Sequence, residues 1–187
     1  MEVTKTNIEG VLLVKPRVFR DNRGFFSETY SKKLYSSHGL KENFVQDNFS
    51  HSSKGTLRGL HYQLQHPQGK LVRVTRGSVF DVAVDIRKHS KTYGKYFSVT
   101  LDDLEFKQLY MPPGIAHGFC VMSDEVDFEY KCTDYYYPDD QHGISWNDPS
   151  LGIEWPISNP ILSAQDNGFL GILEINKSKL PGVEIKL

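Results

Sequence analysis

The chain has 187 residues, with 22 Lys and Arg against 23 Asp and Glu, and a formal net charge of −1. A chain of this length can bury a sizeable core and suits a single domain over residues 1–187. The balanced charge provides no overall basic field for nucleic acid, and no run of about 18 apolar residues predicts a membrane span. The first residues, MEVTKTNIEG, lack the apolar stretch of a secretion signal, so we expect a cytoplasmic protein.

The two cysteines support the same location. Cys120 and Cys132 do not form a CxxC pair, and each lies in an apolar or mixed stretch. This pattern favours reduced, buried thiols, as in cytosolic proteins, over a disulfide or a redox motif.

Short β-rich runs separated by turn residues recur along the chain. Residues 10–15 (GVLLVK) predict a first strand, and residues 21–24 (DNRG) predict a turn, because Asn and Gly tolerate left-handed backbone angles. The SKKLYSSHG segment predicts a short helix, with Ser31 as its N-cap and Gly39 at its end.

A longer strand-rich segment occupies residues 71–86 (LVRVTRGSVFDVAVDI). Two alternating runs flank Gly77-Ser78, which predicts a two-residue β-hairpin. In the second run, Asp81 and Asp85 share a face with small residues, and the other face is uniformly apolar. The segment therefore predicts one core face and one face that could line a polar cavity.

The strand pattern continues to the loop-rich part of the chain. Further runs cover residues 96–101, 106–112, 118–122 and 126–133. Beyond Pro138 loops dominate, and the last 20 residues predict either a helix or a loose terminal segment. Many short strands with almost no helix indicate a sandwich or barrel, so the predicted fold class is all-β.

A metal site is one possibility for such a barrel. Residues 112–117 (PPGIAH) resemble the second sequence signature of the cupins. Cupin metal sites also need an earlier His-x-His pair, but His61 is followed by Tyr62 and Gln63. His66 is out of phase with His61 on a strand, because side chains alternate with period two. We therefore expect no bound metal.

Polar groups are concentrated in residues 44–70 (FVQDNFSHSSKGTLRGLHYQLQHPQGK), as is typical of strands that grip a polar ligand. His61 is the group suited to moving protons near neutral pH, although a hydrogen-bonded core histidine explains the pattern equally well. As a base, His61 needs a carboxylate to fix its tautomer. Asp81, Asp85 and Asp166 are all candidates for that partner.

Other polar residues admit two interpretations. Residues 130–137 (YKCTDYYY) are rich in tyrosine, which ordinarily packs as an amphipathic side chain. A phenol opposite a histidine would nevertheless be able to return a proton to a carbanion from the other face. Arg23 and Lys70 fit solvated surface charges, whereas Arg58, in the TLRGLH run, is harder to explain as one.

Six collinear segments resemble one known family. They are DNRGFFSETY, FVQDNFSHSSKGTLRGLHYQ, QGKLVRVTRGSVFDVAVDIRKHSKTYGK, MPPGIAHGF, EYKCTDYYYP and WNDPSLGIEWP. Over about residues 2–166 the chain resembles the dTDP-4-dehydrorhamnose 3,5-epimerases. The resemblance implies a cupin-like jelly-roll barrel with short helices and a loose C-terminal segment, working without metal or cofactor. It also implies an isomerase of rhamnose biosynthesis that inverts carbons 3 and 5 of dTDP-4-dehydro-6-deoxy-D-glucose to give dTDP-4-dehydro-L-rhamnose.

The resemblance assigns roles residue by residue. His61 would be the general base, Asp166 its carboxylate partner, and Tyr130 the acid on the opposite face. Lys70 would lie beside the developing enolate oxygen, where a fixed positive charge stabilises the transition state more than the ketone. Substrate-binding positions of the family match Arg23, Glu28, Gln46, Asn48, Arg58, His117 and Tyr136. Among these, Tyr136 would stack on thymine and the two arginines would bind the diphosphate.

The chain departs from the family pattern at Gln141 and Gln165. Many members carry Glu at the first position and Lys or Arg at the second, so one charge of each sign is missing. The departures leave open a mono-epimerase specific for carbon 3 or carbon 5, or an epimerase of another nucleotide-linked 4-keto sugar. A non-catalytic sugar-binding barrel and a metal-dependent cupin oxygenase are alternatives from other classes.

The resemblance also implies a homodimer. Family members are homodimers in which the N-terminal strand often crosses to the partner. Arg23 and Glu28 would then complete the neighbour's site. Neither nucleic acid nor a membrane is an expected partner.

Overall fold

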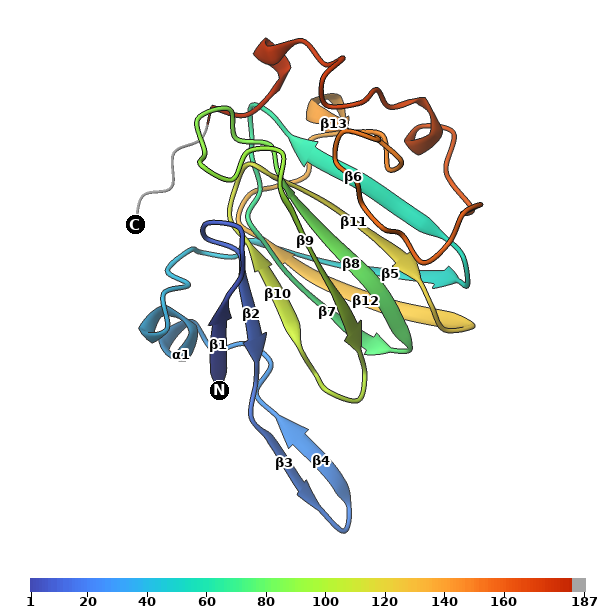
Figure 1. Cartoon of the computed structure of the whole chain (residues 1–187). Coiled ribbons are helices and arrows are strands. Elements are labelled where there is room, and N and C mark those ends of the chain that lie inside the picture. Colours follow the sequence, from blue (N-terminus) through green and yellow to red (C-terminus); the bar gives the residue numbers. More distant parts are fainter. Residues whose placement is uncertain (183–187) are drawn as a thin grey trace.

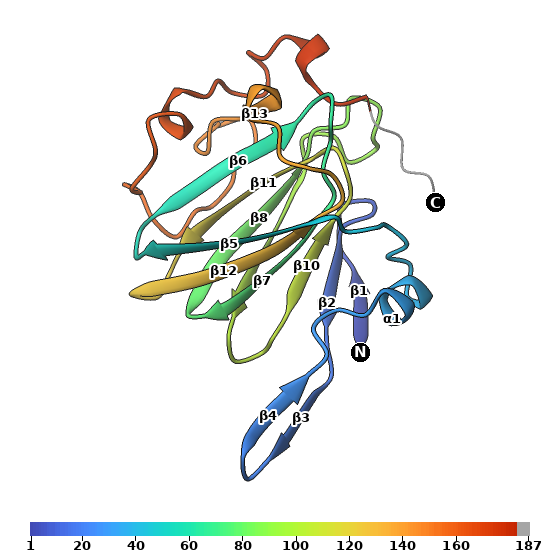
Figure 2. The same cartoon turned by 180° about the vertical axis from the view of Figure 1, so that it is seen from behind.

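The computed structural model describes residues 1–182, and two antiparallel sheets packed face to face make up most of it (Figures 1 and 2). One α-helix, α1 (Lys32–Ser37), occurs in this part of the chain. The all-β prediction is therefore confirmed. Across the same residues, no helix has the length and apolar character needed to cross a membrane.

The larger sheet has six strands in the order β1-β2-β10-β7-β12-β5. These are β1 (Glu2–Lys5), β2 (Leu12–Lys15), β10 (Gln108–Met111), β7 (Lys70–Arg76), β12 (Glu125–Cys132) and β5 (Gln46–Ser53). The second sheet has five strands in the order β13-β6-β11-β8-β9. These are β13 (Gln141–Gly143), β6 (Leu57–Gln63), β11 (Ile115–Val121), β8 (Ser78–Asp85) and β9 (Tyr96–Asp102). A separate hairpin of β3 (Val18–Asp21) and β4 (Gly24–Ser27) projects away from both sheets (Figure 1).

Alternation along the strands divides the apolar residues between two layers. Val79 of β8 and Phe128 of β12 lie in the main core between the sheets. Val82 belongs to a second buried cluster on the outer face of the five-stranded sheet, together with Ile172 and Leu180 of the C-terminal segment. The C-terminal segment thus covers the sheet that carries β6 and β11.

The predicted helix is confirmed, with the predicted ends. The Ser31 side chain accepts a hydrogen bond from the Leu34 backbone N–H at 3.4 Å, which is the N-cap contact. Gly39 follows the helix with φ of +99°, a backbone angle that favours glycine. The wholly buried Tyr35 fixes the helix in a cluster with Val14 of β2.

The predicted hairpin at Gly77-Ser78 is wrong. Strand β7 pairs with β10 and β12, whereas β8 pairs with β9 and β11, so the two strands belong to different sheets. Gly77, with φ of +83°, leads the chain from one sheet to the other, and a Cβ there would collide with the Glu125 carbonyl oxygen. Alternation cannot distinguish a hairpin from this corner, because both leave the same hydrophobic pattern on each strand.

The strand predicted within residues 10–15 is confirmed as β2 (Leu12–Lys15), but it is not the first strand, because β1 (Glu2–Lys5) precedes it. β1 pairs with β2 at the edge of the larger sheet and is mostly exposed, so no apolar alternation marks it in the sequence.

The segment after Ser163 contains two short 3-10 turns, η2 (Asp166–Gly168) and η3 (Lys177–Lys179). No α-helix occurs in it up to residue 182. It is irregular but packed, because Ile172 and Leu180 are buried. The last part of the predicted C-terminal segment, residues 183–187, lies outside the described residues.

Candidate active site

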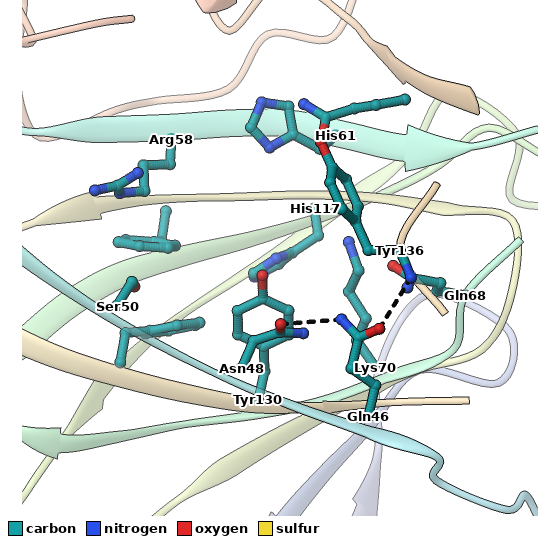
Figure 3. A pocket seen from close by; sticks show the side chains of 13 residues that line it. Gln46, Asn48, Ser50, Arg58, His61, Gln68, Lys70, His117, Tyr130 and Tyr136 are labelled. Atoms are coloured by element: carbon teal, nitrogen blue, oxygen red, sulfur yellow. Dashed lines mark hydrogen bonds between the residues drawn. The ribbon is translucent and has the colours of Figure 1, made fainter. Parts of the chain in front are cut away.

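A pocket of about 370 Å³ opens between the two sheets (Figure 3). Strands β5, β7 and β12 line it from one side, and β6 and β11 line it from the other. This volume is within the usual range for small-molecule sites. The predicted site residues that line it are Gln46, Asn48, Arg58, His61, Lys70, His117, Tyr130 and Tyr136.

His61 is held by Asp166. Its Nε2 lies 2.5 Å from Asp166 Oδ1, and the Asp166 side chain is only 4% exposed. The Ser163 hydroxyl accepts a hydrogen bond from the Asp166 backbone N–H at 3.0 Å, which holds turn η2 in place. Because Nε2–H donates to the carboxylate, Nδ1 is the ring nitrogen with a free lone pair. The pair can therefore act as an oriented general base.

The other two candidate carboxylates have different partners. Asp81 is wholly buried, and its oxygens lie 2.9 and 3.0 Å from His117 Nε2. Asp85, also buried, accepts hydrogen bonds from Arg87 Nε at 2.8 Å and Nη2 at 2.6 Å. His117 pairs directly with His61 across β11 and β6, so two His–Asp pairs lie next to one another in this sheet.

An irregularity in β6 brings Arg58 and His61 into the same pocket. Regular alternation would place residues three apart on opposite faces. The register with β11 shifts here, so that three steps along β6 match two along β11, as in a β-bulge. Gly59 permits this with φ of +131°, and a Cβ on it would lie 2.5 Å from Gly118 Cα. Two glycines therefore allow the close approach on which the site depends.

Tyr130 enters the pocket from the six-stranded sheet, across from His61 (Figure 3). Burial raises the pKa of Tyr130 to about 12, and nearby Cys132 acts in the same direction. The Arg58 cation opposes the shift without cancelling it. The phenol therefore stays protonated near neutral pH and can donate a proton.

Lys70 begins β7 and extends toward the centre of the pocket (Figure 3). Burial lowers the pKa of its ammonium group, while Cys132 and Asp81 raise it in part. The buried Asp81 therefore has two basic neighbours. Its negative charge attracts the Lys70 ammonium group, and its side chain is hydrogen-bonded to His117.

The side chains that are predicted to bind the substrate are held by hydrogen bonds. Gln46 Nε2 donates to Asn48 Oδ1 at 3.0 Å, and Gln46 Oε1 accepts from the Tyr136 backbone N–H at 3.0 Å (Figure 3). Arg58 Nε donates to Ser52 Oγ at 3.0 Å. These contacts connect the polar side chains of β5 (Gln46, Asn48 and Ser52) to Arg58 of β6 and to the loop that carries Tyr136.

Arg23 and Glu28 do not line this pocket. Arg23 occupies the turn of the β3–β4 hairpin, where its side chain is 85% exposed and paired with Asp21 at 2.6 Å. Glu28 directly follows β4 and lines a separate cavity of about 250 Å³ at the base of the hairpin. The hairpin projects away from the sheets in both views (Figures 1 and 2).

Some lining residues were missed by the sequence reasoning. Ser50 lies two residues from Asn48, and Phe128 two residues from Tyr130, so each shares a strand face with a predicted residue, and the period-two rule was sufficient to find them. Gln68 lies in the loop before β7, where no periodicity operates.

The two departures from the family pattern are in direct contact. Gln141 lines the pocket, and its Nε2 donates to Gln165 Oε1 at 3.3 Å. Because Gln165 directly precedes Asp166, the neutral amide pair links β13 to the segment that holds the His61 partner.

Among residues 1–182, no group of three or more His, Cys, Asp or Glu side chains is arranged to hold a metal ion. His66 instead stacks on Tyr137, with ring centroids 3.9 Å apart.

Known proteins share this sequence and this fold. The sequence model described as dTDP-4-dehydrorhamnose 3,5-epimerase matches residues 5–172. The enzyme of that name from Shigella flexneri is 54% identical over 168 residues, covering 89% of this chain and 93% of the relative. A dTDP-4-dehydrorhamnose 3-epimerase from Streptomyces niveus is 37% identical, covering 96% of this chain and 88% of the relative.

A solved structure from Legionella pneumophila, a dTDP-6-deoxy-D-glucose-3,5-epimerase in complex with dTDP-4-keto-L-rhamnose, superposes with a TM-score of 0.95. It is 45% identical, and the match covers 98% of this chain and 99% of that one. The predicted barrel is thus confirmed. The chain belongs to the family of dTDP-4-dehydrorhamnose 3,5-epimerases, isomerases that act on dTDP-linked sugars in rhamnose biosynthesis.

Proposed function

We propose that this protein inverts carbons 3 and 5 of dTDP-4-dehydro-6-deoxy-D-glucose, giving dTDP-4-dehydro-L-rhamnose, with His61 and Tyr130 as its base and acid. Both carbons flank the ketone at carbon 4, so their hydrogens become acidic when the enolate is stabilised. The observation that carries the proposal is the placement of His61, oriented by Asp166, across the pocket from Tyr130. The chemistry requires no redox cofactor.

His61 removes the proton beside the ketone. Its Nε2–H is bonded to Asp166, so Nδ1 accepts the proton and the imidazole becomes an imidazolium. The buried carboxylate 2.5 Å away stabilises that positive charge. The electron pair of the broken C–H bond passes to the carbonyl oxygen as an enolate.

Lys70 stabilises the enolate oxygen. A fixed cation is worth more to the developing oxyanion than to the neutral ketone, so it lowers the barrier as well as improving binding. Lys70 is partly buried in the pocket, and the burial that lowers its pKa also reduces solvent screening of its charge, which strengthens the interaction. His117, whose Nε2–H donates to Asp81, keeps a lone pair on Nδ1 that can accept a hydrogen bond from a substrate hydroxyl.

Tyr130 returns a proton from the other face. Inversion requires that a proton leave from one side of the carbon and another arrive from the opposite side. A phenol with a pKa of about 12 is protonated at neutral pH and is therefore ready to donate. The enolate collapses to the ketone, and solvent then restores the proton of Tyr130 and removes the one on His61.

The remaining residues bind the nucleotide. Tyr136, at the edge of the pocket with its side chain half exposed, provides a flat surface for the thymine ring, and Arg58 provides a cation for the diphosphate. Gln46 and Asn48 contribute amide groups for the sugar and nucleoside.

A homodimer accounts for the two predicted residues that stand apart. Arg23 and Glu28 lie on or beside a hairpin whose Phe25 and Phe26 are 56% and 68% exposed. Apolar side chains on a projecting hairpin are suited to a subunit interface. In such a dimer, Arg23 would reach the diphosphate in the partner's pocket. The two free, buried cysteines fit a cytoplasmic enzyme.

Product analysis by NMR tests the reaction. Incubation with dTDP-4-dehydro-6-deoxy-D-glucose should give a sugar inverted at both carbons. Inversion at one carbon alone would reduce the protein to a mono-epimerase, the activity named for the 37% identical relative from Streptomyces niveus. Trials with other nucleotide-linked 4-keto sugars would show whether the Gln141–Gln165 pair shifts specificity.

A further inference from the structure

The buried side-chain amide of Gln63, on the same strand as His61, holds the loop that follows β12 (residues 133–137, the tyrosine-rich loop). Gln63 lies at the end of β6, two residues after His61, and is 5% exposed. Its Oε1 accepts from the Tyr137 backbone N–H at 2.9 Å. Its Nε2 donates to the Tyr135 carbonyl at 3.1 Å and to the His66 carbonyl at 2.7 Å. Both donors and the acceptor of this side chain are therefore used by backbone groups.

The Asp140 carboxylate, which follows the tyrosine-rich loop in the chain, binds the start of the β6–β7 loop. Asp140 is buried, and its two oxygens accept from the backbone N–H groups of Leu64, Gln65 and His66 at 2.8 to 3.2 Å. Burial alone would raise the pKa of this carboxyl, but the three N–H groups outweigh it and hold the pKa below its usual range. The His66 ring also stacks on Tyr137. The β6–β7 loop and the tyrosine-rich loop thus form one bonded unit.

Tyr136 is the centre of that unit. The residues on either side of it, Tyr135 and Tyr137, are bonded to Gln63, and its own N–H is bonded to Gln46. Its side chain is left half exposed at the pocket. Three successive residues are therefore fixed from strands β5 and β6, while the central ring remains available to a ligand.

We propose that Gln63 is a positioning residue for nucleotide binding, holding Tyr136 as a ready-made surface for the base, with Asp140 bracing the same loops. The inference rests on the proposed function, because it assumes that a dTDP-sugar occupies the pocket. Gln63 does not line the pocket, so its proposed effect on the ligand is indirect, through the loop that carries Tyr136. A loop fixed before the ligand arrives loses little conformational entropy on binding.

The first test is the affinity for dTDP, measured by calorimetry. Gln63→Leu keeps the buried volume but leaves two carbonyls and one N–H without their partner, and Gln63→Asn is too short to reach them. We expect both changes to weaken dTDP binding by roughly tenfold or more. KM for the keto sugar should rise by a similar factor, while kcat changes by less than about threefold.

A double-mutant cycle separates positioning from a general loss of structure. In a Tyr136→Ala background the ring is already absent, so Gln63→Leu should change the dTDP affinity by less than about twofold. Gln108→Leu is the matched control. Gln108 is also buried and bonded, to Tyr35 Oη and the Thr29 carbonyl, both at 2.8 Å, but it lies away from this pocket. Gln108→Leu should destabilise the fold and leave the dTDP affinity unchanged.

The outcomes distinguish this inference from the proposed reaction. An equal loss of affinity in both Tyr136 backgrounds, or a fall in kcat with unchanged affinity, would overturn the positioning role. If the wild-type protein binds dTDP but does not epimerise the dTDP-linked keto sugar, the proposed reaction is overturned. The double-mutant cycle on dTDP affinity would still test the positioning role of Gln63. A wild-type protein that does not bind dTDP would overturn both.

Discussion

His61 Nε2 and Asp166 Oδ1 are 2.5 Å apart although the residues are separated by 105 positions in the chain. Strand β6 supplies the histidine, and the irregular C-terminal segment that covers its sheet supplies the carboxylate. In the proposed mechanism, the packing of that segment is therefore a condition for catalysis, since it carries the group that orients the proposed base.

Asp166→Asn tests this relationship. The amide keeps the size of the carboxylate but removes the charge that stabilises the imidazolium. We expect kcat to fall by roughly 10²–10⁴-fold, with the dTDP affinity nearly unchanged. Steady-state kinetics and calorimetry measure the two effects. Asp139→Asn, at an exposed position, is the control and should alter neither quantity.

Tyr130→Phe should separate proton removal from inversion. His61 is intact in this variant, so it can still take a proton and return it to the same face. We expect deuterium from solvent to enter the substrate with retained configuration, while inversion slows by roughly 10²–10⁴-fold. NMR of the recovered sugar distinguishes the two. Inversion at the wild-type rate would remove Tyr130 from the role of acid.

The pH dependence of the wild type should reflect the burial of Tyr130. Its pKa of about 12 lies above the ordinary tyrosine value of about 10, so the protonated form persists as pH rises through that ordinary value. The ultraviolet absorbance of phenolate, compared between wild type and Tyr130→Phe, should therefore show Tyr130 ionising well above pH 10. Ionisation near 10 would contradict this account.

Lys70→Met should separate activity from stability. Losing the cation beside the enolate should lower kcat by roughly 10²–10³-fold. The pKa of Lys70 is lowered in the folded state, so the unfolded chain binds this proton more tightly. The free energy of unfolding of the wild type should therefore rise with pH as Lys70 deprotonates, until the ordinary lysine pKa of about 10.4 is passed.

Lys70→Met removes that rise, and at neutral pH it should be at least as stable as the wild type because no charge is buried. Chemical denaturation at a series of pH values gives the comparison. A variant that is several kcal/mol less stable at neutral pH would show that Lys70 is a structural residue.

Mixing two inactive variants tests the dimer. His61→Ala lacks the base, and Arg23→Ala lacks the hairpin arginine. If Arg23 completes the partner's pocket, a mixed dimer contains one site with both residues intact, and activity returns after subunit exchange. If Arg23 served its own chain, mixing would restore nothing, and if it served no site, Arg23→Ala would already be active before mixing. Light scattering gives the oligomeric state in parallel.

Much of the fold was accessible from the sequence because period-two alternation is a local property. The strands β9 to β12 and the capped helix α1 follow from it and from turn residues. The corner at Gly77 did not, because sheet membership depends on pairing with distant strands. The exposed edge strand β1 has no apolar pattern to reveal it.

The site was predictable from the residues in part. The density of polar groups in residues 44–70 pointed to His61, but spacing did not rank Asp81, Asp85 and Asp166 as its partner. Only the family resemblance selected Asp166, and the fold shows why spacing fails, since Asp81 is committed to His117. The bulge at Gly59, which turns Arg58 into the pocket, also breaks the period-two rule on which sequence reasoning relies.

Solvent exchange at the two carbons beside the ketone tests the central claim most directly. In D₂O, the wild-type protein should place deuterium at both carbon 3 and carbon 5 of dTDP-4-dehydro-6-deoxy-D-glucose, and His61→Ala should slow this exchange by roughly 10²–10⁴-fold. Exchange at neither carbon, or at an unchanged rate in His61→Ala, would contradict the account.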